Sequence, residues 1–506
     1  MKIEIRTNAF WIYDYVMHNS KLIYDLTITD QITNTSQKLY DYDQYEKILK
    51  IPRGVGIDFV KQRIYEDKIN KHDLEFVDMT GNNFYKERNA FMFDMKEEYK
   101  PKDSHQEGAI NFLVSENNIN NNQKFLTLNT GFGKTFCAIY AASILKLPVL
   151  VISRNLSDQW IREFLKYTKL EESDVMNIVG SKHIEIICSS KNYAKKYTET
   201  LYVTTIDTLR SFKNNKNGDL NILCRNLGIG IKIFDEAHLH YVASTNMDVN
   251  MNTKYTWYLT ATPGRSQFME DKLFKRIFVN IPFYGEHTHK LNNHYNLVYV
   301  SYNSAPKKED VMKCMTIRGF NSKFYAEYIF RSNNKVLLLY GIVRRFIKDL
   351  LERDPDAKSI IILDRLVDIE TFYKLFTTDT GIDASVGKYC TLVDKSIRHK
   401  ELESNIILST IGSIGAGRDI KKLKSIHCLS PFSSPIITKQ ILGRLRNIEG
   451  EDVYYYDYID EGFPPMKEQR KGRMKELKPR SKTERFLVVN DEEVFTYIKK
   501  NISFKK

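Results

Sequence analysis

The sequence predicts an α/β protein in which two parallel-sheet lobes follow a small N-terminal domain of α/β or β-rich structure. From about residue 96, apolar runs of strand length alternate with helical stretches, which is typical of a parallel sheet wrapped by helices. A second series of the same kind begins near residue 291. The predicted domains are residues 1–95, 96–290 and 291–478, followed by a C-terminal tail at 479–506.

The N-terminal domain is predicted from two segments. Residues 21–30 (KLIYDLTITD) alternate apolar and polar side chains, which suits a half-buried strand. Residues 47–64 (KILKIPRGVGIDFVKQRI) predict a strand, a turn at Pro52–Gly56 and then a helix. Neither pattern predicts any chemistry by itself.

The two lobes are predicted from short apolar segments that suit buried strands. The expected strands of the first lobe are 124–129, 147–153, 201–205, 231–238 and 255–262, with helices at 133–147, 157–168 and 206–212. The expected strands of the second lobe are 294–302, 357–364, 404–412, 423–430 and 452–460.

Composition restricts the class of protein. The chain has 506 residues, of which 42% are hydrophobic and 27% charged, and these values are typical of a soluble globular protein. No apolar run approaches the roughly 20 residues of a membrane span, and the first residues do not read as a secretion signal. Six cysteines without a CxxC pair predict neither a metal framework nor a disulfide scaffold, so a cytoplasmic protein is expected.

The net charge is 76 − 63 = +13. This excess favours a polyanionic partner such as nucleic acid, although an ordinary basic surface is the alternative. The segment from Lys467 to Arg485 contains nine Lys or Arg and three Glu. It is expected to be either a phosphate-contacting helix or a solvated face.

Residues 126–136 (LTLNTGFGKTF) join an expected strand to an expected helix through glycines. In such a loop, backbone N–H groups and the helix N-terminus converge on phosphate oxygens, and a side chain in place of glycine would block their approach. Lys134 is expected to reach the β- and γ-phosphates, and Thr135 to place its hydroxyl on Mg²⁺. The predicted nucleotide-binding residues of this loop are Thr130, Gly131, Gly133, Lys134 and Thr135. Leu128 departs from the Gly or Ala usual at its position, and an ordinary strand-to-helix turn is the alternative.

Residues 231–238 (IKIFDEAH) predict a strand that ends in two carboxylates. Ligands of parallel sheets bind at the carboxyl ends of strands. Asp235 is expected to hold Mg²⁺ and Glu236 to polarise the attacking water, because phosphoryl transfer depends mainly on positioning and charge neutralisation. Alone, the pair is more simply a surface feature. With the phosphate loop it predicts ATP hydrolysis, with ATP and Mg²⁺ as cofactors.

With both motifs identified, residues 99–475 resemble the superfamily 2 helicases of the DEAH type. That family reads adenine with a glutamine, which corresponds here to Gln106 in YKPKDSHQEGAI. VISRNLSDQWIREF and VTTIDTL resemble its strand-contacting motifs, and YLTATPGR resembles the motif that couples hydrolysis to strand movement. The resemblance implies two tandem RecA-like lobes and assigns nucleic-acid contact or coupling in the first lobe to Arg154, Thr205, Thr260 and Thr262.

The second lobe resembles the same family in three segments. SIIILDR resembles a motif that contacts the nucleic-acid backbone, and STIGSIGAGRDI resembles the motif that follows it. QILGRLRN resembles the arginine-finger motif. The resemblance implies nucleic-acid contact or coupling by Arg365, Thr410 and Gln440, and nucleotide contact by Gly417 and Asp419.

The arginine-finger motif departs from the family pattern, which has arginines four and seven positions after its glutamine. Here Arg444 follows Gln440 at plus four, but Asn447 stands at plus seven and Arg446 lies one place early. Arg444 is the expected catalytic arginine, with Arg446 as the other candidate. Such an arginine accelerates hydrolysis by roughly 10³–10⁵ in related enzymes.

Within the superfamily, the chain is similar to viral and phage DNA helicases. The GFGKT loop and the small domain with KIPRG resemble the poxvirus transcript-release helicases, and the chain is also similar to phage branch-migration helicases. The expected partner is single-stranded, duplex or branched DNA, with RNA as the alternative and no membrane association. The expected location is the cytoplasm, or that of a host cell for a viral protein.

Three hypotheses follow. The first is an ATP-driven DNA helicase or translocase, and the second is an RNA helicase or transcript-release factor. The third is a nucleic-acid-binding assembly module that does not unwind. Trp160 and Trp257 are expected to be core anchors more than base-stacking platforms, and Tyr454–Tyr456 a buried strand.

Overall fold

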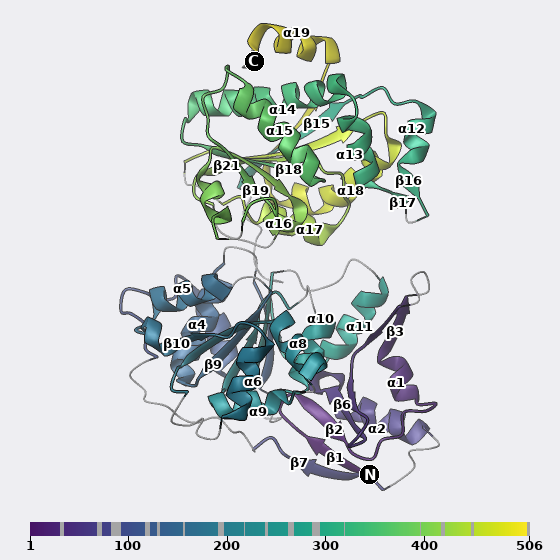
Figure 1. Cartoon of the computed structure of the whole chain (residues 1–506), viewed down its shortest axis with the longest axis vertical. Coiled ribbons are helices and arrows are strands. Elements are labelled where there is room, and N and C mark those ends of the chain that lie inside the picture. Colours follow the sequence, from purple (N-terminus) through teal and green to yellow (C-terminus); the bar gives the residue numbers. More distant parts are fainter. Residues whose placement is uncertain are drawn as a thin grey trace. The chain divides into compact units, whose positions relative to one another are not determined.

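A computed structural model gives the structure of the chain as two compact units, Met1–Thr288 and His289–Lys506 (Figure 1). Unit 1 contains a five-stranded and a seven-stranded sheet, and unit 2 contains a second seven-stranded sheet. The structure describes residues 1–30, 35–67, 73–81, 93–116, 122–128, 132–154, 157–190, 197–216, 218–237, 241–261, 268–285, 294–317, 319–394, 396–415, 420–446 and 450–502.

The N-terminal part of unit 1 is built on a sheet with the order β5-β6-β2-β1-β7. Its elements are β1 (Lys2–Ile5), β2 (Ala9–Ile12), α1 (Lys21–Asp25), β3 (Thr27–Asp30), β4 (Thr35–Lys38), β5 (Asp41–Asp43), β6 (Ile48–Pro52), the 3-10 turn η1 (Arg53–Val55), α2 (Ile57–Glu66) and β7 (Glu75–Asp78). The predicted strand, turn and helix at 47–64 are confirmed. The predicted strand at 21–30 is wrong in its first half, because the Ser20 side chain accepts a hydrogen bond from the Ile23 N–H and starts a helix there.

The N-terminal sheet packs on the rest of unit 1 through polar and apolar contacts. The Asn8 side chain donates to the carbonyls of Asp248 and Met251, and the Trp11 indole N–H donates to the Val249 carbonyl at 3.1 Å. One apolar core runs without a break from Phe10 on β2 into the seven-stranded sheet. The two sheets of unit 1 therefore share a core.

The seven-stranded sheet of unit 1 is parallel throughout, with the order β10-β11-β9-β12-β13-β8-β14. Its strands are β8 (Gln123–Thr127), β9 (Val149–Ser153), β10 (Val175–Asn177), β11 (Leu201–Thr205), β12 (Ile231–Phe234), β13 (Tyr255–Thr260) and β14 (Phe283–Tyr284). Alternate residues of the central strands belong to two separate apolar cores, one on each face. Burial on both faces explains why these strands read as continuous apolar runs.

Helices cover both faces of this sheet (Figure 1). They are α3 (Ser104–Val114), α4 (Lys134–Leu145), α5 (Ser157–Tyr167), α6 (Ser181–Ser189), α8 (Ile206–Lys216), α9 (Leu220–Leu227), α10 (Tyr241–Asp248) and α11 (Phe268–Phe278), with a short turn η2 (Glu172–Asp174). The first lobe therefore has the alternating architecture that the sequence predicts.

The sheet of unit 2 is also parallel, with the order β19-β20-β18-β21-β22-β15-β23. Its strands are β15 (Tyr295–Tyr302), β18 (Lys358–Leu363), β19 (Val386–Tyr389), β20 (Ile406–Thr410), β21 (Leu423–Cys428), β22 (Tyr454–Asp460) and β23 (Ser481–Val488), and a separate hairpin joins β16 (Met315–Thr316) to β17 (Gly319–Phe320). The helical elements are α12 (Lys308–Lys313), α13 (Ser322–Phe330), α14 (Asn333–Arg353), α15 (Leu366–Thr378), η3 (Arg398–Glu403), α16 (Ile411–Gly415), α17 (Pro435–Leu442), α18 (Pro464–Leu477), η4 (Lys478–Arg480) and α19 (Asp491–Asn501).

The last two elements extend the second lobe. Strand β23 pairs in parallel with β15 and forms the edge of the sheet. Helix α19 packs on α14 at Gly341, where a Cβ would come within 2.8 Å of the Ile498 side chain. The Arg344 guanidinium also donates to the Tyr497 hydroxyl at 2.6 Å. These contacts hold α19 against α14.

The predicted fold class is confirmed: two tandem parallel-sheet lobes of RecA-like architecture accompany an N-terminal β-rich region. Trp160 and Trp257 are buried core residues, as are Tyr455 and Tyr456. Among the described helices, none combines the length and the apolar character needed to cross a membrane.

Candidate functional site

Five adjacent strands of unit 1 carry the predicted site residues at their carboxyl ends. In the order β11, β9, β12, β13 and β8, the residues at or just after these ends are Thr205, Arg154, Asp235, Thr260 and the phosphate loop. The registers pair Thr205 with Ser153, and Thr260 with Thr127, so neighbouring strands end level. Residues far apart in the chain are thereby gathered along one edge of the sheet, where parallel sheets bind ligands.

The described part of the phosphate loop starts at Phe132 and leads directly into α4. Gly133 caps this helix with φ 85°, a left-handed conformation that glycine adopts without strain. Lys134 and Thr135 form the first turn of α4 and are half-buried. The N–H groups of such a first turn point out of the helix and are available to an anion. Thr130 and Gly131 lie outside the described residues.

Gln106 on α3 touches the phosphate loop. Its side-chain N–H donates to the Phe132 carbonyl at 3.0 Å, and its side-chain oxygen accepts from the Lys102 N–H at 2.9 Å. A Cβ at Gly133 would come within 2.7 Å of the Gln106 Nε2 atom, so a larger residue, already strained by the positive φ, would also displace the Gln106 amide. The glutamine amide keeps one further N–H and one further lone pair for a ligand.

Asp235 and Glu236 lie in the turn that follows β12. Burial raises the pKa of Asp235 to about 6, and the neighbouring Glu236 carboxylate acts in the same direction. The Trp160 indole, the Lys134 ammonium and the Glu236 N–H act in the opposite direction. Glu236 has φ 48°, a conformation that residues other than glycine rarely adopt, and its N–H donates to Asp235 Oδ1 at 3.0 Å.

The sequence did not predict the contact between Trp160 and Asp235. The Trp160 indole N–H donates to Asp235 Oδ2 at 2.8 Å, and the ring is 1% exposed. With the Glu236 N–H on Oδ1, each carboxylate oxygen of Asp235 has one donor, which fixes the orientation of the carboxylate. Trp160 is both the core anchor that was predicted and a neighbour of the site. No local sequence signal indicated this contact.

Strand β13 connects the two halves of the site. The Leu128 N–H, at the end of β8, donates to the Thr260 carbonyl at 3.3 Å. The Ala237 N–H, just after the acidic pair, donates to the Leu259 carbonyl at 3.0 Å. A shift of the end of β13 would therefore move both the phosphate loop and the acidic pair. Thr262 lies outside the described residues, as does His238, the last residue of IKIFDEAH.

The residues present fit a nucleotide with Mg²⁺. A glycine-capped helix N-terminus, a lysine and a threonine lie at the same sheet edge as two carboxylates, and Mg²⁺ prefers oxygen ligands of this kind. Thr135 and Asp235 are the residues that would hold the metal. The arrangement suits phosphoryl transfer, which depends on positioning and charge neutralisation.

A threonine at the end of a strand caps the next helix in both units. Thr205 Oγ1 accepts from the Thr208 N–H at 3.2 Å, and Thr410 Oγ1 accepts from the Ser413 N–H at 3.3 Å. Both threonines are half-buried at the carboxyl end of their sheet. Their cap geometry is the same, although the sequence links them only through separate motifs.

Arg365 follows β18 and caps α15. Its guanidinium binds the buried Asp368 carboxylate through Nη2 at 2.6 Å and Nε at 3.0 Å. Because this pair is held within one helix turn, part of the donor capacity of Arg365 is already used.

The two candidate finger arginines lie in different environments. Arg444 is buried, and its Nε donates to the Ile414 carbonyl at 3.0 Å. Arg446 is half-buried, as is Gln440 on α17. The remaining residues of these motifs, Gly417, Asp419 and Asn447, lie outside the described residues.

The basic segment from Lys467 to Arg485 is neither a continuous phosphate-contacting helix nor a wholly solvated face. Arg470 and Arg473 are buried on α18, and both bind the buried Asp457 carboxylate on β22, at 2.8 and 2.7 Å. Arg470 and Arg473 therefore form buried ion pairs within the second lobe. The number of charges in the sequence does not indicate which of them are buried.

Comparisons with known proteins relate this chain to one family model and to several solved structures. Residues 99–265 match the family described as Type III restriction enzyme, res subunit. Mss116p bound to ssRNA and AMP-PNP is similar in fold, with a TM-score of 0.52 and 14% identity over 79% of this chain and 77% of that chain. Among curated proteins, none matches this sequence.

Two further solved structures share the fold. S. cerevisiae Dbp5 bound to RNA and ADP BeF3 has a TM-score of 0.50 and 16% identity over 79% of this chain and 93% of that chain. A putative HsdR subunit fragment of a type I restriction enzyme from Vibrio vulnificus YJ016 has a TM-score of 0.50 and 15% identity, covering 90% and 81%. The family match over residues 99–265, with the fold of the two units, supports a helicase-like ATPase of superfamily 2.

Proposed function

We propose that this chain is an ATP-driven motor of the DEAH type that moves on, or remodels, duplex or branched DNA. The observation that carries the proposal is the convergence of Lys134, Asp235 and Glu236 at one edge of a parallel sheet. The nucleic-acid side rests on the superfamily, on the net charge of +13 and on the motifs of both lobes.

The proposed chemistry assigns one task to each residue. The N-terminus of α4 and Lys134 bind the phosphates, and Thr135 and Asp235 hold Mg²⁺, which supplies further neutralisation of phosphate charge when bound. Glu236 orients and polarises the attacking water. Gln106, already hydrogen-bonded to the phosphate loop, reads the adenine.

Arg446 is the more accessible candidate for the arginine that neutralises charge on the γ-phosphate. The burial of Arg444 and its bond to the Ile414 carbonyl favour a structural role for that residue. We propose contact with the nucleic acid or coupling for Arg154, Thr205, Thr260, Thr262, Arg365, Thr410 and Gln440, and nucleotide contact for Gly417 and Asp419.

An RNA motor is the second candidate. Two of the structures that share this fold hold RNA, which favours it. The match to a restriction-enzyme subunit favours DNA instead. The chain also lacks a PTRELA-like stretch, which many RNA helicases carry in the first lobe.

The test is the steady-state ATPase rate without nucleic acid, and then with single-stranded DNA, duplex DNA, a four-way junction and RNA. Strong stimulation by DNA, greatest with the junction and weaker at high salt, is expected because binding through phosphates releases counterions. Stimulation by RNA alone would support the second candidate. A rate that no nucleic acid changes would remove the motor proposal.

Three variants accompany this test. Lys134→Ala should abolish turnover, and Glu236→Gln should abolish hydrolysis while nucleotide still binds. Lys169→Ala changes an exposed lysine just beyond α5 and serves as the matched control. If Lys169→Ala were as inactive as Lys134→Ala, the loss would not report on the site.

A further inference from the structure

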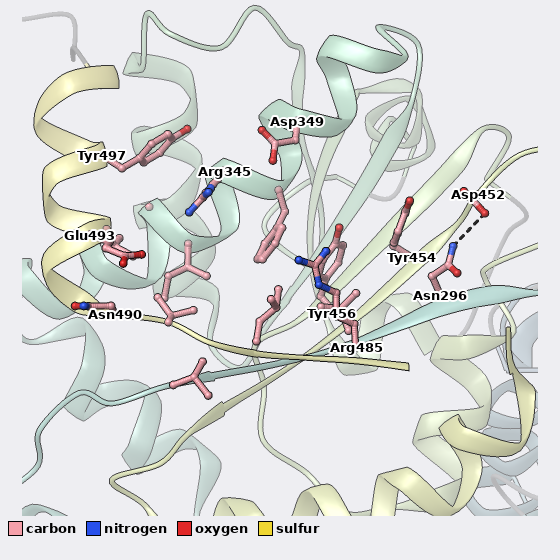
Figure 2. A pocket seen from close by; sticks show the side chains of 18 of the residues that line it. Asn296, Arg345, Asp349, Asp452, Tyr454, Tyr456, Arg485, Asn490, Glu493 and Tyr497 are labelled. Carbon is pink, nitrogen blue, oxygen red and sulfur yellow. Dashed lines mark hydrogen bonds between the residues drawn. The ribbon is translucent and has the colours of Figure 1, made fainter. Parts of the chain in front are cut away.

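Unit 2 contains a cavity that none of the motifs discussed above uses. Its volume is about 600 Å³, and it lies between α14, α19 and one face of β15, β22 and β23 (Figure 2). Small-molecule sites in proteins typically occupy about 300–1,000 Å³. The cavity is therefore large enough for a ligand of nucleotide size.

One wall of the cavity is a stack of aromatic rings. The Tyr456 ring lies 4.5 Å from the buried His427 ring and parallel to it, and 4.6 Å from the Phe346 ring on α14. The Tyr454 ring continues the stack at 6.0 Å from Tyr456 and is half-buried. An aromatic surface that is rigid and partly open suits stacking of a planar ring.

Three arginines line this cavity and are exposed, Arg345 and Arg353 from α14 and Arg485 from β23. Arg353 donates to the Asp349 carbonyl at 2.9 Å and lies 5.9 Å from the Tyr454 ring. Figure 2 labels the other two, Arg345 and Arg485. The strand registers put Arg485 in one row with Val298 and Tyr456, directly beside the aromatic stack. Within the part of the chain that the structure describes, neither the Arg345 nor the Arg485 guanidinium forms a hydrogen bond or an ion pair with another side chain. Their N–H groups are therefore available to a ligand, and a guanidinium matches the geometry of phosphate oxygens.

The acidic residues of the cavity differ in whether their carboxylates already have hydrogen-bond or ion-pair partners. Asp452 accepts a hydrogen bond from the Asn296 side chain at 3.1 Å, which is drawn as a dashed line in Figure 2. It also pairs with Lys482 at 3.2 Å. Asp349 and Glu493 form no ion pair among the described residues. A ligand that suits this lining carries an anionic group for the arginines and N–H donors for the carboxylates.

We propose that this cavity binds a nucleotide unit, with its base against the tyrosine stack and its phosphate on Arg345 and Arg485. A nucleobase supplies the planar ring and the N–H donors, and the phosphate supplies the anion. The unit can come from a free nucleotide or from one residue of a single-stranded nucleic acid. The site is separate from Lys134 and does not depend on ATP hydrolysis.

The test is binding of fluorescently labelled AMP to the full chain, followed by anisotropy. AMP lacks the β- and γ-phosphates that Lys134 is proposed to bind but keeps the adenine proposed for Gln106, so the arginine variants below, and not AMP alone, assign the binding to the cavity. We expect saturable binding at one AMP per chain that is unchanged in Lys134→Ala. Removing both guanidinium groups in Arg345→Ala/Arg485→Ala should weaken binding about tenfold or more, since hydrogen bonds to charged groups are lost.

Two controls test the geometry. Arg331→Ala removes an exposed arginine of unit 2 that is paired with Glu327 outside the cavity, and it should bind AMP normally. Tyr454→Ala should weaken binding, whereas Tyr454→Phe, which keeps the ring, should not. Thermal melting of each variant confirms that unit 2 remains folded.

A labelled single-stranded oligonucleotide, used alone and as a competitor of AMP, distinguishes the two sources of the ligand. Displacement of AMP with weaker oligonucleotide binding in the double arginine variant assigns the cavity to nucleic acid, and AMP binding without displacement assigns it to free nucleotide. The proposal is overturned if neither probe binds more weakly to the double variant, if Arg331→Ala has the same effect, or if inorganic phosphate alone binds as tightly as AMP. Failure of the ATPase test leaves this result unaffected.

Discussion

Trp160 shows how a single core residue can act on the proposed metal site. Its indole N–H is one of two donors that orient the Asp235 carboxylate. Groups that orient metal ligands commonly change metal affinity by about 10–100-fold when removed. Trp257 is also buried on the same unit, but its indole N–H has no partner among the described residues, so it offers a matched comparison.

Trp160→Phe should raise the Mg²⁺ concentration needed for half-maximal nucleotide binding about tenfold, because Asp235 loses a donor while the ring packing is kept. Mg²⁺ titrations of labelled-nucleotide binding and of ATPase rate measure this shift. Trp257→Phe should leave the Mg²⁺ dependence unchanged. An equal shift in both variants would mean that loss of packing, and not the hydrogen bond, is responsible.

His427 links the stability of unit 2 to pH. The ring is buried between Ser425, at 3.1 Å, and the Tyr458 hydroxyl, at 2.9 Å, and burial lowers its pKa to about 3. The folded state therefore keeps the ring neutral at pH values where the unfolded chain, with a pKa near 6.5, takes up a proton. The stabilising contribution is complete above about pH 6.5 and is lost as the pH falls.

Between about pH 6 and 4, the free energy of unfolding of the wild type should fall by about 1.4 kcal/mol per pH unit more than that of His427→Gln, which cannot take up this proton. Urea unfolding followed by circular dichroism at several pH values measures the difference. His399→Gln changes an exposed histidine and should keep the wild-type slope. Parallel slopes for the wild type and His427→Gln would contradict the assignment.

At the scale of elements, the turn η1 joins the N-terminal sheet to α11. The Gly54 carbonyl accepts from the Asn280 N–H and from the Asn280 side chain, both at 3.1 Å. A Cβ at Gly54 would lie 2.1 Å from the Ile277 carbonyl oxygen and 2.7 Å from Ile281. Because one of these neighbours is backbone, the contact cannot relax by a simple side-chain rotation.

Gly54→Ala should therefore lower the free energy of unfolding of unit 1 by about 2–3 kcal/mol, at the upper end of what overpacking costs. Urea unfolding followed by tryptophan fluorescence measures this loss. Gly81→Ala is the matched control, because nothing lies within 4 Å of a Cβ at that position, and it should change the stability by less than about 0.5 kcal/mol. Equal stability of the two variants would show that the contact at η1 is not tight.

At the scale of the whole molecule, the shared core of unit 1 predicts its folding behaviour. Phe10 and Ile51 from the N-terminal sheet and Phe125 and Tyr258 from the large sheet belong to one continuous cluster. The N-terminal region therefore covers apolar surface that the large sheet would otherwise expose to water. We expect the two sheets of unit 1 to unfold together.

All three tryptophans lie in unit 1, with Trp11 on the N-terminal sheet and Trp257 on the large sheet. Two variants that each keep a single tryptophan, either Trp11 or Trp257, are compared. In each variant, the urea midpoint from fluorescence should equal the midpoint from circular dichroism. Fluorescence unfolding curves make the measurement. A Trp11 transition at clearly lower urea concentration would show an N-terminal domain that unfolds independently.

The sequence by itself determined the architecture of both lobes, and it supplied the site residues that we propose. Alternating buried strands and helices specify a parallel sheet, because only strands covered on both faces are apolar throughout. A glycine-rich turn before a helix and a carboxylate pair after a strand predicted ligands at one sheet edge, because all strands of a parallel sheet end on the same side.

Only the tertiary structure revealed the roles that depend on contacts between distant residues. The bond from Trp160 to Asp235, the burial of Arg444, Arg470 and Arg473, and the aromatic cavity beside Tyr456 have no local sequence signal. A side chain is indicated in sequence by its type and spacing, whereas its partner is decided by which elements pack together. For the same reason, residues 21–25 formed a helix where alternation alone predicted a strand.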